Sequence, residues 1–378
     1  MPRSDQIACR IRGELRQGQF GYAGDRFLTV RELAERFGIS LSTAQKVVRQ
    51  LKDEGLLVGD STNPAKISLE AVSGGPAESG GPRRLGLVVT NIASPFFSSL
   101  CRHVQFVGLE LGCQVLAASS EYDCLREERA IRGFLEIGVE GLLICPGLAD
   151  ECTRLYRDLL ARGVPVTFVS RRVPQLEADY VVAHNFVGAA SVAGHMLNMG
   201  YRSFGYIAFG PRLDPDVRLS GFRSALQEEG VELPDERVVA GEGRDIQHGY
   251  AAMSHLMQGK NRPRAVLAYN DLLGIGALQY CRDQEIDVPG EAAVAGFDNL
   301  PESRVTTPPL TTVDYGVESM ARLAVQTLLG RIRDPRRLPN RILLEPHLVV
   351  RQSTDPDARD PAASEKTGSS QAGSSIPF

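Results

Sequence analysis

The sequence predicts an α/β protein with a small helical head ahead of two α/β lobes built on parallel sheets, and three observations lead to this fold class. The chain has 378 residues, more than one ordinary hydrophobic core accommodates, so two or three folding units are expected. From residue 85 onward, short apolar runs alternate with amphipathic segments, which is the pattern of βαβ units. Between these parts, eight of the ten residues in 73–82 are Gly, Pro or Ser, a composition typical of a linker.

Residues 29–58 predict two helices joined by a glycine turn and followed by a short strand. Thr29 and Glu32 have the spacing of a capping box, in which each side chain satisfies a free backbone N–H at the start of the helix. Gly38 supplies the left-handed residue that ends the first helix, and Ser40 opens the second. This order of elements is that of a winged helix-turn-helix.

The second of these helices has two distinct faces. The apolar face, which we expect to be buried, comprises Ala44, Val47, Val48 and Leu51. The polar face comprises Ser42, Gln45, Lys46 and Arg49, which fall at i, i+3, i+4 and i+7. A helix that buries one face and exposes such a polar face can enter the major groove of DNA.

This segment resembles the winged helix-turn-helix of the GntR family of DNA-binding proteins. The residues that match the family pattern are Arg31, Leu33, Ala34, Ser40, Thr43, Leu51, Glu54 and Gly55. Three features depart from it: residues 28–29 replace a Pro-Ser pair, Leu41 replaces an Arg that usually contacts DNA, and 59–64 replace a glycine-rich wing tip. The resemblance and the polar face together give the candidate DNA-binding residues Arg31, Ser40, Ser42, Thr43, Gln45, Lys46 and Arg49.

The charge of the head favours DNA binding only slightly. Residues 1–70 contain eleven Lys or Arg against nine Asp or Glu, within a chain whose net charge is −4. Contacts with phosphates therefore depend on the local placement of Arg31, Lys46, Arg49 and Lys66. The alternative is an ordinary solvated face on a three-helix bundle that contacts only protein.

Cysteine usage and the absence of long apolar segments predict the compartment. The seven cysteines are odd in number, scattered and never in a C-x-x-C pair, which is typical of small buried hydrophobic residues in a reducing environment. The N-terminus lacks the apolar stretch of a signal peptide, and no run of about 18 apolar residues occurs. We therefore expect a cytoplasmic protein without a membrane partner.

The predicted domains are the head at 1–70, a flexible linker at 71–84, the two lobes at 85–352 and a disordered tail at 353–378. A flexible linker of this length reaches on the order of 20 Å, so it would tether the head without fixing its orientation. The tail is rich in Asp, Ala, Ser and Gly and has no apolar periodicity.

Seven apolar runs predict the strands of the two lobes: 85–89, 114–118, 141–145, 164–169, 204–209, 265–269 and 292–297. Because these runs do not alternate with polar residues, both faces of each strand are expected to be buried, as in parallel sheets covered by helices on each side. Roughly 270 residues are more than one doubly wound sheet requires, so two lobes with a cleft between them are expected. Ligands bind beyond the carboxyl ends of parallel strands, which would meet at this cleft.

Polar and aromatic side chains follow several of these runs, in the segments 91–97, 170–172, 212–218, 270–271 and 298–299. Aromatic rings stack on small cyclic ligands, while Arg and Asp form paired hydrogen bonds with hydroxyl groups. Each segment alone also fits a helix cap, a turn or core packing. Their joint placement at strand ends predicts a site for a small polyhydroxyl or heterocyclic ligand.

Residues 85–352 resemble the effector-binding core of the lactose-repressor (LacI) family, itself similar to periplasmic sugar-binding proteins. The motifs that carry the resemblance are N-I-A-S-P-F-F at 91–97, H-N-F-V-G-A-A at 184–190, R-L-S-G-F at 218–222, N-D at 270–271, G-F-D-N at 296–299 and T-P-P-L-T-T-V at 307–313. The resemblance implies that the effector contacts Arg218, Asn270 and Asp298 on one wall and Phe96 or Phe97 on the other, with Arg212 and Asp214 adjusting specificity. Arg171 is a further candidate, next to Ser170, where many relatives have Asp.

The family's own DNA-binding head and hinge helix are absent, and the combination is similar to GntR-headed sugar regulators such as the arabinose repressors. These resemblances imply a bacterial transcriptional repressor that binds double-stranded operator DNA as a homodimer and responds to a small, sugar-like effector. The motifs G-x-G-x-x-G, G-x-x-x-x-G-K-[ST], G-x-S-x-G and H-E-x-x-H are all absent, so no enzymatic activity, cofactor or metal is expected. The alternative is a cytoplasmic sugar-binding protein whose degenerate head does not bind DNA.

Overall fold

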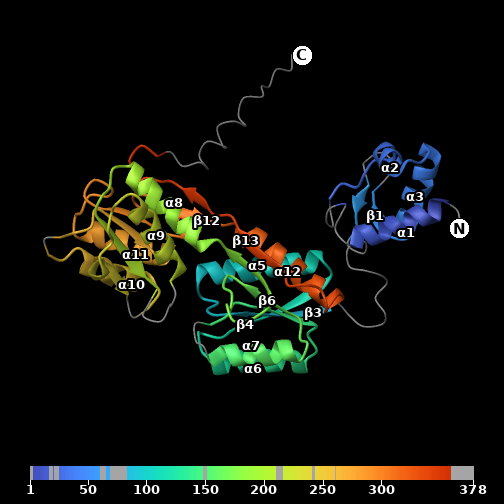
Figure 1. Cartoon of the computed structure of the whole chain (residues 1–378), viewed down its shortest axis with the longest axis horizontal. Helices are drawn as coiled ribbons and strands as arrows, with labels where there is room; N and C mark the ends of the chain where they lie inside the picture. The colour runs from blue at the N-terminus through green and yellow to red at the C-terminus, as the bar shows by residue number, and fades with distance from the viewer. Residues whose placement is uncertain are drawn as a thin grey trace, which may run out of the picture.

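The computed structural model of the chain describes residues 3–16, 20, 25–59, 65–68, 83–147, 151–209, 216–240, 243–259 and 261–358. Figure 1 shows an N-terminal head, in blue, and a body of two α/β lobes. The predicted fold class, an N-terminal helix-turn-helix with α/β lobes on parallel sheets, is confirmed.

The described part of the head comprises α1 (Arg3–Arg16), α2 (Val30–Phe37), α3 (Leu41–Asp53) and the antiparallel pair β1 (Leu57–Val58) and β2 (Lys66–Ile67). Its three helices share a core of fully buried side chains that includes Ile11, Leu15, Leu33, Ala44, Val47 and Leu51. The two strands form the base of a wing, which agrees with the winged helix-turn-helix that the sequence predicts. Most of the predicted wing tip, residues 60–64, lies outside the described residues.

The start and end of α2 follow the prediction in detail. Thr29 Oγ1 accepts a hydrogen bond from Glu32 N at 3.3 Å, and Glu32 Oε2 accepts one from Thr29 N at 2.7 Å, which completes the capping box. Gly38 ends the helix with a φ of 58°, in the left-handed region that glycine adopts without strain.

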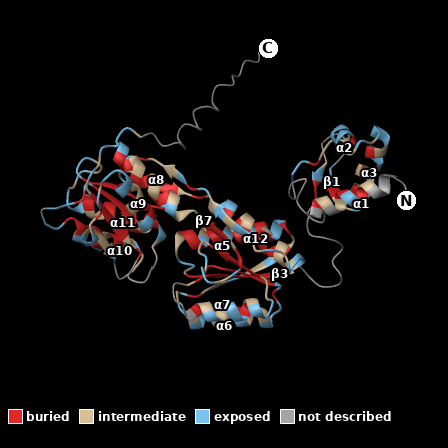
Figure 2. Cartoon of the chain, viewed as in Figure 1, coloured by how far each residue is buried: buried red, intermediate tan, exposed pale blue. Residues whose placement is uncertain are grey.

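The first lobe is a six-stranded parallel sheet with helices on both faces (Figure 1). In spatial order its strands are β13 (Arg341–Leu344), β7 (Asp179–Ala183), β6 (Val166–Val169), β5 (Gly141–Ile144), β3 (Arg83–Val89) and β4 (Cys113–Ser119). Helices α5 (Pro95–Glu110) and α12 (Val317–Arg333) pack on one face, and α6 (Cys124–Glu136) and α7 (Glu151–Ala161) on the other. Figure 2 shows the buried residues concentrated in the sheet between these layers.

The second lobe has a four-stranded parallel sheet in the order β11 (Ala293–Ala295), β10 (Ala265–Ala268), β8 (Phe204–Ala208) and β9 (Val238–Ala240). Helices α8 (Asn185–Asn198) and α9 (Val217–Glu228) cover one face, and α10 (Ile246–Leu256) and α11 (Asp271–Asp283) cover the other. The approach of α9 to α8 requires glycine at 221, because a Cβ there would lie 2.1 Å from the Phe186 carbonyl oxygen.

The chain crosses between the two lobes three times. It passes from β7 into α8, returns from β12 (Thr312–Asp314) into α12, and passes again from β13 to β14 (His347–Val349), which pairs antiparallel with β12. The 3₁₀ helices η1 (Asp235–Arg237) and η2 (Pro301–Arg304) lie within the second lobe. Several separate crossings between two lobes make a hinge about which a cleft can close.

The seven predicted apolar runs correspond to β3, β4, β5, β6, β8, β10 and β11, all of which pair in parallel. Five short strands were not predicted: β7, β9, β12, β13 and β14. Four of these five are half-buried, edge or separately paired strands. Strands β9, β13 and β14 are partly exposed, and β12 contains the polar residues Thr312 and Asp314, so none of the four leaves a long uninterrupted apolar run.

Two predicted boundaries differ from the structure. Strand β3 begins at Arg83, inside the segment predicted as linker. The predicted tail begins at 353, yet Ser353 and Thr354 are fully buried. Ser353 Oγ donates to Val294 O at 2.6 Å and accepts from Thr311 N at 2.8 Å, so a polar segment is fixed by backbone hydrogen bonds rather than by the apolar contacts that a sequence pattern reveals.

Six cysteines within the described residues are free thiols, and five of them are buried, as small hydrophobic residues are. Burial raises the pKa of the Cys101 thiol to about 11, so this group stays protonated at neutral pH. Among the described residues, no helix has the length and apolar character needed to cross a membrane.

Candidate functional site

The N-terminus of α3 is built from hydroxyl side chains. Ser40 caps the helix: its Oγ accepts from Thr43 N at 3.2 Å and lies 3.0 Å from Ser42 Oγ and 2.8 Å from Thr43 Oγ1. The partial positive charge of a helix N-terminus favours an anion such as a DNA phosphate. The hydrogen bonds between Ser40 and Thr43 fix the first turn of α3, and the side chain of Ser42 is exposed.

The outer face of α3 is solvent-exposed, as predicted, and presents Ser42, Gln45, Lys46 and Arg49. Arg31, on α2, is also exposed, whereas Thr43 is partly buried. Leu41 lies at the start of α3 with 52% of its surface exposed, so an apolar side chain occupies a position next to the hydroxyl cluster. Six of the seven predicted DNA-binding residues thus lie on α3 or at its N-cap and Arg31 lies on α2, and the exposed side chains of Arg31, Gln45, Lys46 and Arg49 take no part in the helix cap.

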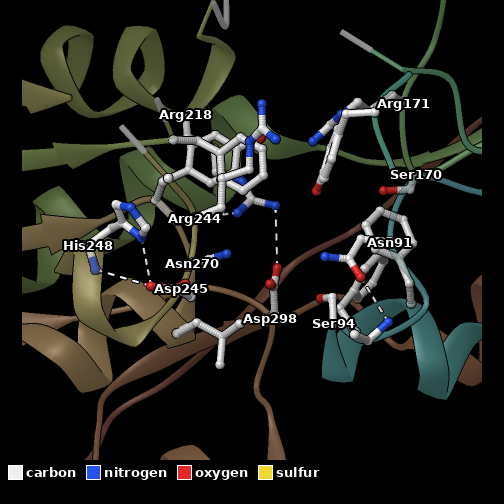
Figure 3. A pocket seen from close by; sticks show the side chains of 18 of the residues that line it. Asn91, Ser94, Ser170, Arg171, Arg218, Arg244, Asp245, His248, Asn270 and Asp298 are labelled. Atoms are coloured by element: carbon white, nitrogen blue, oxygen red, sulfur yellow. Dashed lines mark hydrogen bonds and ion pairs between the residues drawn. The ribbon is translucent and has the colours of Figure 1, made fainter. Parts of the chain in front are cut away.

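A cavity of about 430 Å³ lies between the two lobes, and both contribute to its walls (Figure 3). From the first lobe come Asn91, Ala93, Ser94, Phe96, Phe97, Tyr122, Ser170 and Arg171. From the second lobe and the crossings come Asn185, Phe209, Arg218, Gly243, Arg244, Asp245, His248, Tyr269, Asn270, Leu272, Asp298 and Tyr315. A volume of this size is suited to a small molecule.

The first-lobe wall begins where α5 starts. Pro95 occupies the first turn of α5, where its missing N–H has no helical acceptor to lose. The rings of Phe96 and Phe97 meet edge to face with centroids 4.9 Å apart, and Phe96 also lies 5.8 Å from the Tyr315 ring. Both phenylalanines are nearly buried, so they shape the wall as part of the core and expose only an edge to the cavity.

Arg218 is the most heavily engaged charged side chain of the second-lobe wall. It lies in the first turn of α9, whose N-cap Asp216 accepts from Arg218 N at 3.0 Å. Its Nε donates to Asn185 Oδ1 at 2.8 Å, its Nη1 donates to the Tyr269 carbonyl oxygen, and its Nη2 lies 3.5 Å from Asp298 Oδ1. These bonds leave little of the guanidinium free, so its edge toward the cavity is held in one orientation.

Asp298 lies opposite this guanidinium in an unusual backbone conformation, with a φ of 114°. Its Oδ1 also accepts from the Tyr315 hydroxyl at 3.0 Å. Burial raises the pKa of Asp298, and the nearby Arg218 charge opposes that rise. Non-glycine residues with such φ values cluster at binding sites, which agrees with the position of Asp298 on the cavity wall.

Asn270 caps α11, because its Oδ1 accepts from Leu273 N at 3.0 Å. Figure 3 shows its amide nitrogen directed toward the cavity. The neighbouring Asp271 points into the core, where it accepts from Leu300 N at 2.7 Å and from the Thr312 hydroxyl at 2.5 Å. Burial raises the pKa of Asp271 to about 8.

The remaining cavity wall holds residues that the sequence analysis did not select. Among them, Arg244 lies near the Phe209 ring, as the predicted Arg171 also does, and Asp245 Oδ1 lies 2.7 Å from His248 Nδ1. Residues 243–248 follow β9, an edge strand of half-buried and exposed residues that leaves no buried apolar run, and this is why the pattern of strand ends missed them.

Six of the eight predicted effector-binding residues line this cavity: Phe96, Phe97, Arg171, Arg218, Asn270 and Asp298. The other two, Arg212 and Asp214, lie outside the described residues. In the described part of the chain, no group of three or more His, Cys, Asp or Glu side chains is arranged to hold a metal ion.

Comparisons with known proteins agree with this architecture. The family profile described as "Bacterial regulatory proteins, gntR family" matches residues 3–66, and the profile described as "Periplasmic binding protein-like domain" matches residues 193–354. The ribose operon repressor of Escherichia coli (strain K12) is 26% identical over 332 residues, which cover 86% of this chain and 99% of that protein.

Two solved structures are similar over nearly their whole length. One, described as a transcriptional regulator of the LacI family from Sanguibacter keddieii, is 30% identical with a TM-score of 0.64 and covers 72% of this chain and 99% of that chain. The other, the transcriptional regulator CelR in complex with cellobiose, is 26% identical with a TM-score of 0.65 and covers 86% of this chain and 99% of that chain. These relatives are regulators rather than enzymes, as predicted for this protein. The chain therefore belongs to the LacI family of transcriptional regulators, and its effector domain is joined to a GntR-type helix-turn-helix.

Proposed function

We propose that the protein is a repressor whose head binds operator DNA and whose inter-lobe cavity binds a small, sugar-like effector that controls this binding. The observation that carries the proposal is the cavity itself, which both lobes line and to which two of the three crossings contribute residues. A ligand that contacts both walls stabilises the closed arrangement of the lobes over the open one.

The chemistry of the cavity supports a polyhydroxyl ligand. Aromatic side chains supply faces for a sugar ring, and Arg218, Asp298 and Asn270 supply donors and acceptors for hydroxyl groups. The similar CelR structure is a complex with cellobiose, and another relative is the repressor of a ribose operon. Both names support a sugar as the ligand class here.

Closure of the lobes can reach the DNA only through an assembly of two heads. We propose a homodimer formed through the α/β body, in which each head binds one half-site of a two-fold operator. A change in the relation of the lobes then alters the spacing or orientation of the heads, and so their joint affinity for DNA. We place this activity in the cytoplasm, where chromosomal operators are accessible.

The face of α3 is the part of the head on which DNA binding depends in this proposal. Lys46→Ala and Arg49→Ala are expected to weaken binding to operator fragments selected from genomic DNA, because each removes an exposed cation from the face that enters the groove. If either side chain contacts a phosphate, the slope of log K against log salt falls by about one. Fluorescence anisotropy over a salt series measures both effects.

Arg282→Ala is the matched control, since Arg282 is an exposed arginine at the end of α11, in the second lobe. Its operator affinity should equal that of the wild-type protein. Absence of any sequence-preferring DNA binding, with and without sugars, would refute the repressor function and would favour a sugar-binding protein with a degenerate head.

A further inference from the structure

One arginine of the cavity has a buried guanidinium nitrogen without a hydrogen-bond acceptor among the described residues. Arg171 is the second residue after β6. The first, Ser170, has a φ of 66° and turns the chain at the end of the strand. Its Nη1 is buried and has no hydrogen-bond partner among the described residues. The contact made by its guanidinium in the described structure is with the Phe209 ring, 5.4 Å from Cζ to the centroid.

An unsatisfied buried donor is costly, and more so when it is charged. A guanidinium N–H that loses water without gaining an acceptor destabilises the folded protein. Contacts with an aromatic ring compensate part of this free-energy cost, but they leave the N–H groups in the guanidinium plane without acceptors. A ligand that brings an acceptor to this point recovers the lost interaction, and a negatively charged acceptor recovers most.

Burial raises the pKa of Asp298 and the charge of Arg171 opposes part of that rise, but the two side chains form no ion pair. The carboxylates among the described cavity residues are Asp298 and Asp245, and each has its own partners. Asp298 accepts from the Tyr315 hydroxyl and lies 3.5 Å from Arg218, while Asp245 interacts with His248 at 2.7 Å. Neither forms an ion pair with Arg171.

A second guanidinium lies near the same ring from the other lobe. Arg244 Cζ is 5.0 Å from the Phe209 centroid and 3.9 Å from that of Tyr122. Among the described residues, three arginines and two carboxylates line the cavity, and two of the arginines, Arg171 and Arg244, come from opposite lobes (Figure 3). In surroundings of low dielectric constant, these charges act on a ligand more strongly than they would in water.

We propose that the effector is an acidic sugar, whose carboxylate or phosphate group binds Arg171 while Arg244 adds attraction from the opposite lobe. The proposal rests on the proposed function and names the ligand class of its site. It also gives the anion a role in closure, because a group attracted to both lobes favours the state in which they approach each other.

Calorimetry on the full-length protein with matched sugars tests the proposal. The probes are glucose, glucuronate and glucose 6-phosphate; galactose and galacturonate; and ribose and ribose 5-phosphate. At least one acidic sugar is expected to bind more tightly than its neutral parent by about tenfold or more. Comparison of the uronates with the phosphates decides which anion the site takes.

Variants of Arg171 show whether this residue causes the preference for an acidic sugar over its neutral parent. Arg171→Gln should weaken binding of the acidic sugar by about tenfold or more and leave the neutral parent within about twofold, while Arg171→Lys should retain part of the preference. Arg172→Gln is the control, because it removes the same charge from the exposed neighbouring position. It should leave the preference unchanged.

Three outcomes would overturn the proposal: a neutral sugar as the tightest ligand of the panel, no measurable binding of any acidic sugar, or an equal loss for acidic and neutral sugars in Arg171→Gln. The proposed function is judged separately, by operator binding. A protein that binds its operator and is released by a neutral sugar would keep the repressor function and refute only the acidic ligand.

Discussion

At the scale of single residues, burial changes the pKa of a carboxyl group in the first lobe that does not line the cavity. Glu127, on α6, is 1% exposed, and one of its oxygens accepts a hydrogen bond from the Tyr156 hydroxyl of α7. Burial raises the pKa of Glu127 to about 7 from an ordinary 4.5, although the Tyr156 bond opposes the rise. The carboxyl group is therefore protonated in the folded protein over a pH range in which it is ionised in the unfolded chain.

This difference gives the stability a defined dependence on pH. Between about pH 4.5 and 7 the folded state binds one more proton than the unfolded state, so the contribution of Glu127 is fully present below pH 4.5 and is lost as the pH rises through 7. Glu127→Gln, which stays neutral and can still accept from Tyr156, should be more stable than wild type at pH 8 by about 1 to 3 kcal/mol. Urea unfolding at several pH values measures the difference.

Glu136→Gln, an exposed position on the same helix, should follow the wild-type pH profile. Parallel profiles for Glu127→Gln and wild type would show that Glu127 is not the group responsible. Asp271, whose pKa burial also raises, is present in all these proteins, so its contribution cancels in the comparison.

At the scale of elements, one carboxylate anchors the connection between α12 and β13. Asp179, at the start of β7, is fully buried and accepts from Arg331 Nε at 2.9 Å and from Arg337 Nη2 at 2.8 Å. Asn340 N donates to it at 2.6 Å, directly before β13. The end of α12, the loop after it and the edge strand β13 are thus fixed to the sheet by one side chain.

Asp179→Ala should reduce the free energy of unfolding by about 3 to 5 kcal/mol, because it leaves two largely buried arginines without their carboxylate. Glu177→Ala is the matched control: Glu177 forms an ion pair with Arg341 nearby, but its side chain is 81% exposed, so the loss should be about 0 to 1 kcal/mol. Urea denaturation of the two variants measures the contrast, and similar losses in both would contradict the role assigned to Asp179.

The same elements show what the sequence could predict and what it could not. Strands β3, β5 and β6 are covered on both faces, so each leaves an apolar run that is visible without a structure. Strand β13 alternates exposed and half-buried residues, and its place beside β7 depends on contacts with Asp179 made across more than 150 residues of chain. No local pattern records such a contact.

The residues of the candidate site also divide into those that the sequence could predict and those that it could not. Residues after buried strands or within family motifs, such as Arg171, Asn270 and Asp298, could be selected from the sequence, and they line the cavity. Arg244 and Tyr122 could not be, because their contact with each other depends on how the two lobes face each other. The orphaned Nη1 of Arg171 is likewise a property of the folded cavity alone.

At the scale of the whole molecule, the proposed dimer requires a surface, and α5 offers one. Phe106 and Leu109 lie on its outer face with 57% and 72% of their surfaces exposed. This helix covers the face of the first sheet opposite to α6 and α7. Large apolar side chains grouped on one helix are typical of a surface that a partner covers.

Replacing both side chains, as Phe106→Glu with Leu109→Glu, should convert the dimer to a monomer, because two like charges would be brought together with their copies across a two-fold interface. Sedimentation equilibrium of the full-length chain at micromolar concentration measures the change. Affinity for a two-half-site operator should fall by at least about 100-fold, since the second head no longer binds at a high effective concentration. Affinity for a single half-site should be unchanged.

Leu125→Glu places a charge at an equally exposed leucine on α6, on the opposite side of the first lobe, and should leave the dimer intact. A wild-type protein that is monomeric at micromolar concentration would remove the basis for paired half-sites. A double variant that remains dimeric would instead move the interface away from α5. In that case the exposed Leu343 on edge strand β13 is the next apolar position to replace, since an edge strand of a parallel sheet also offers unpaired backbone groups to a second copy.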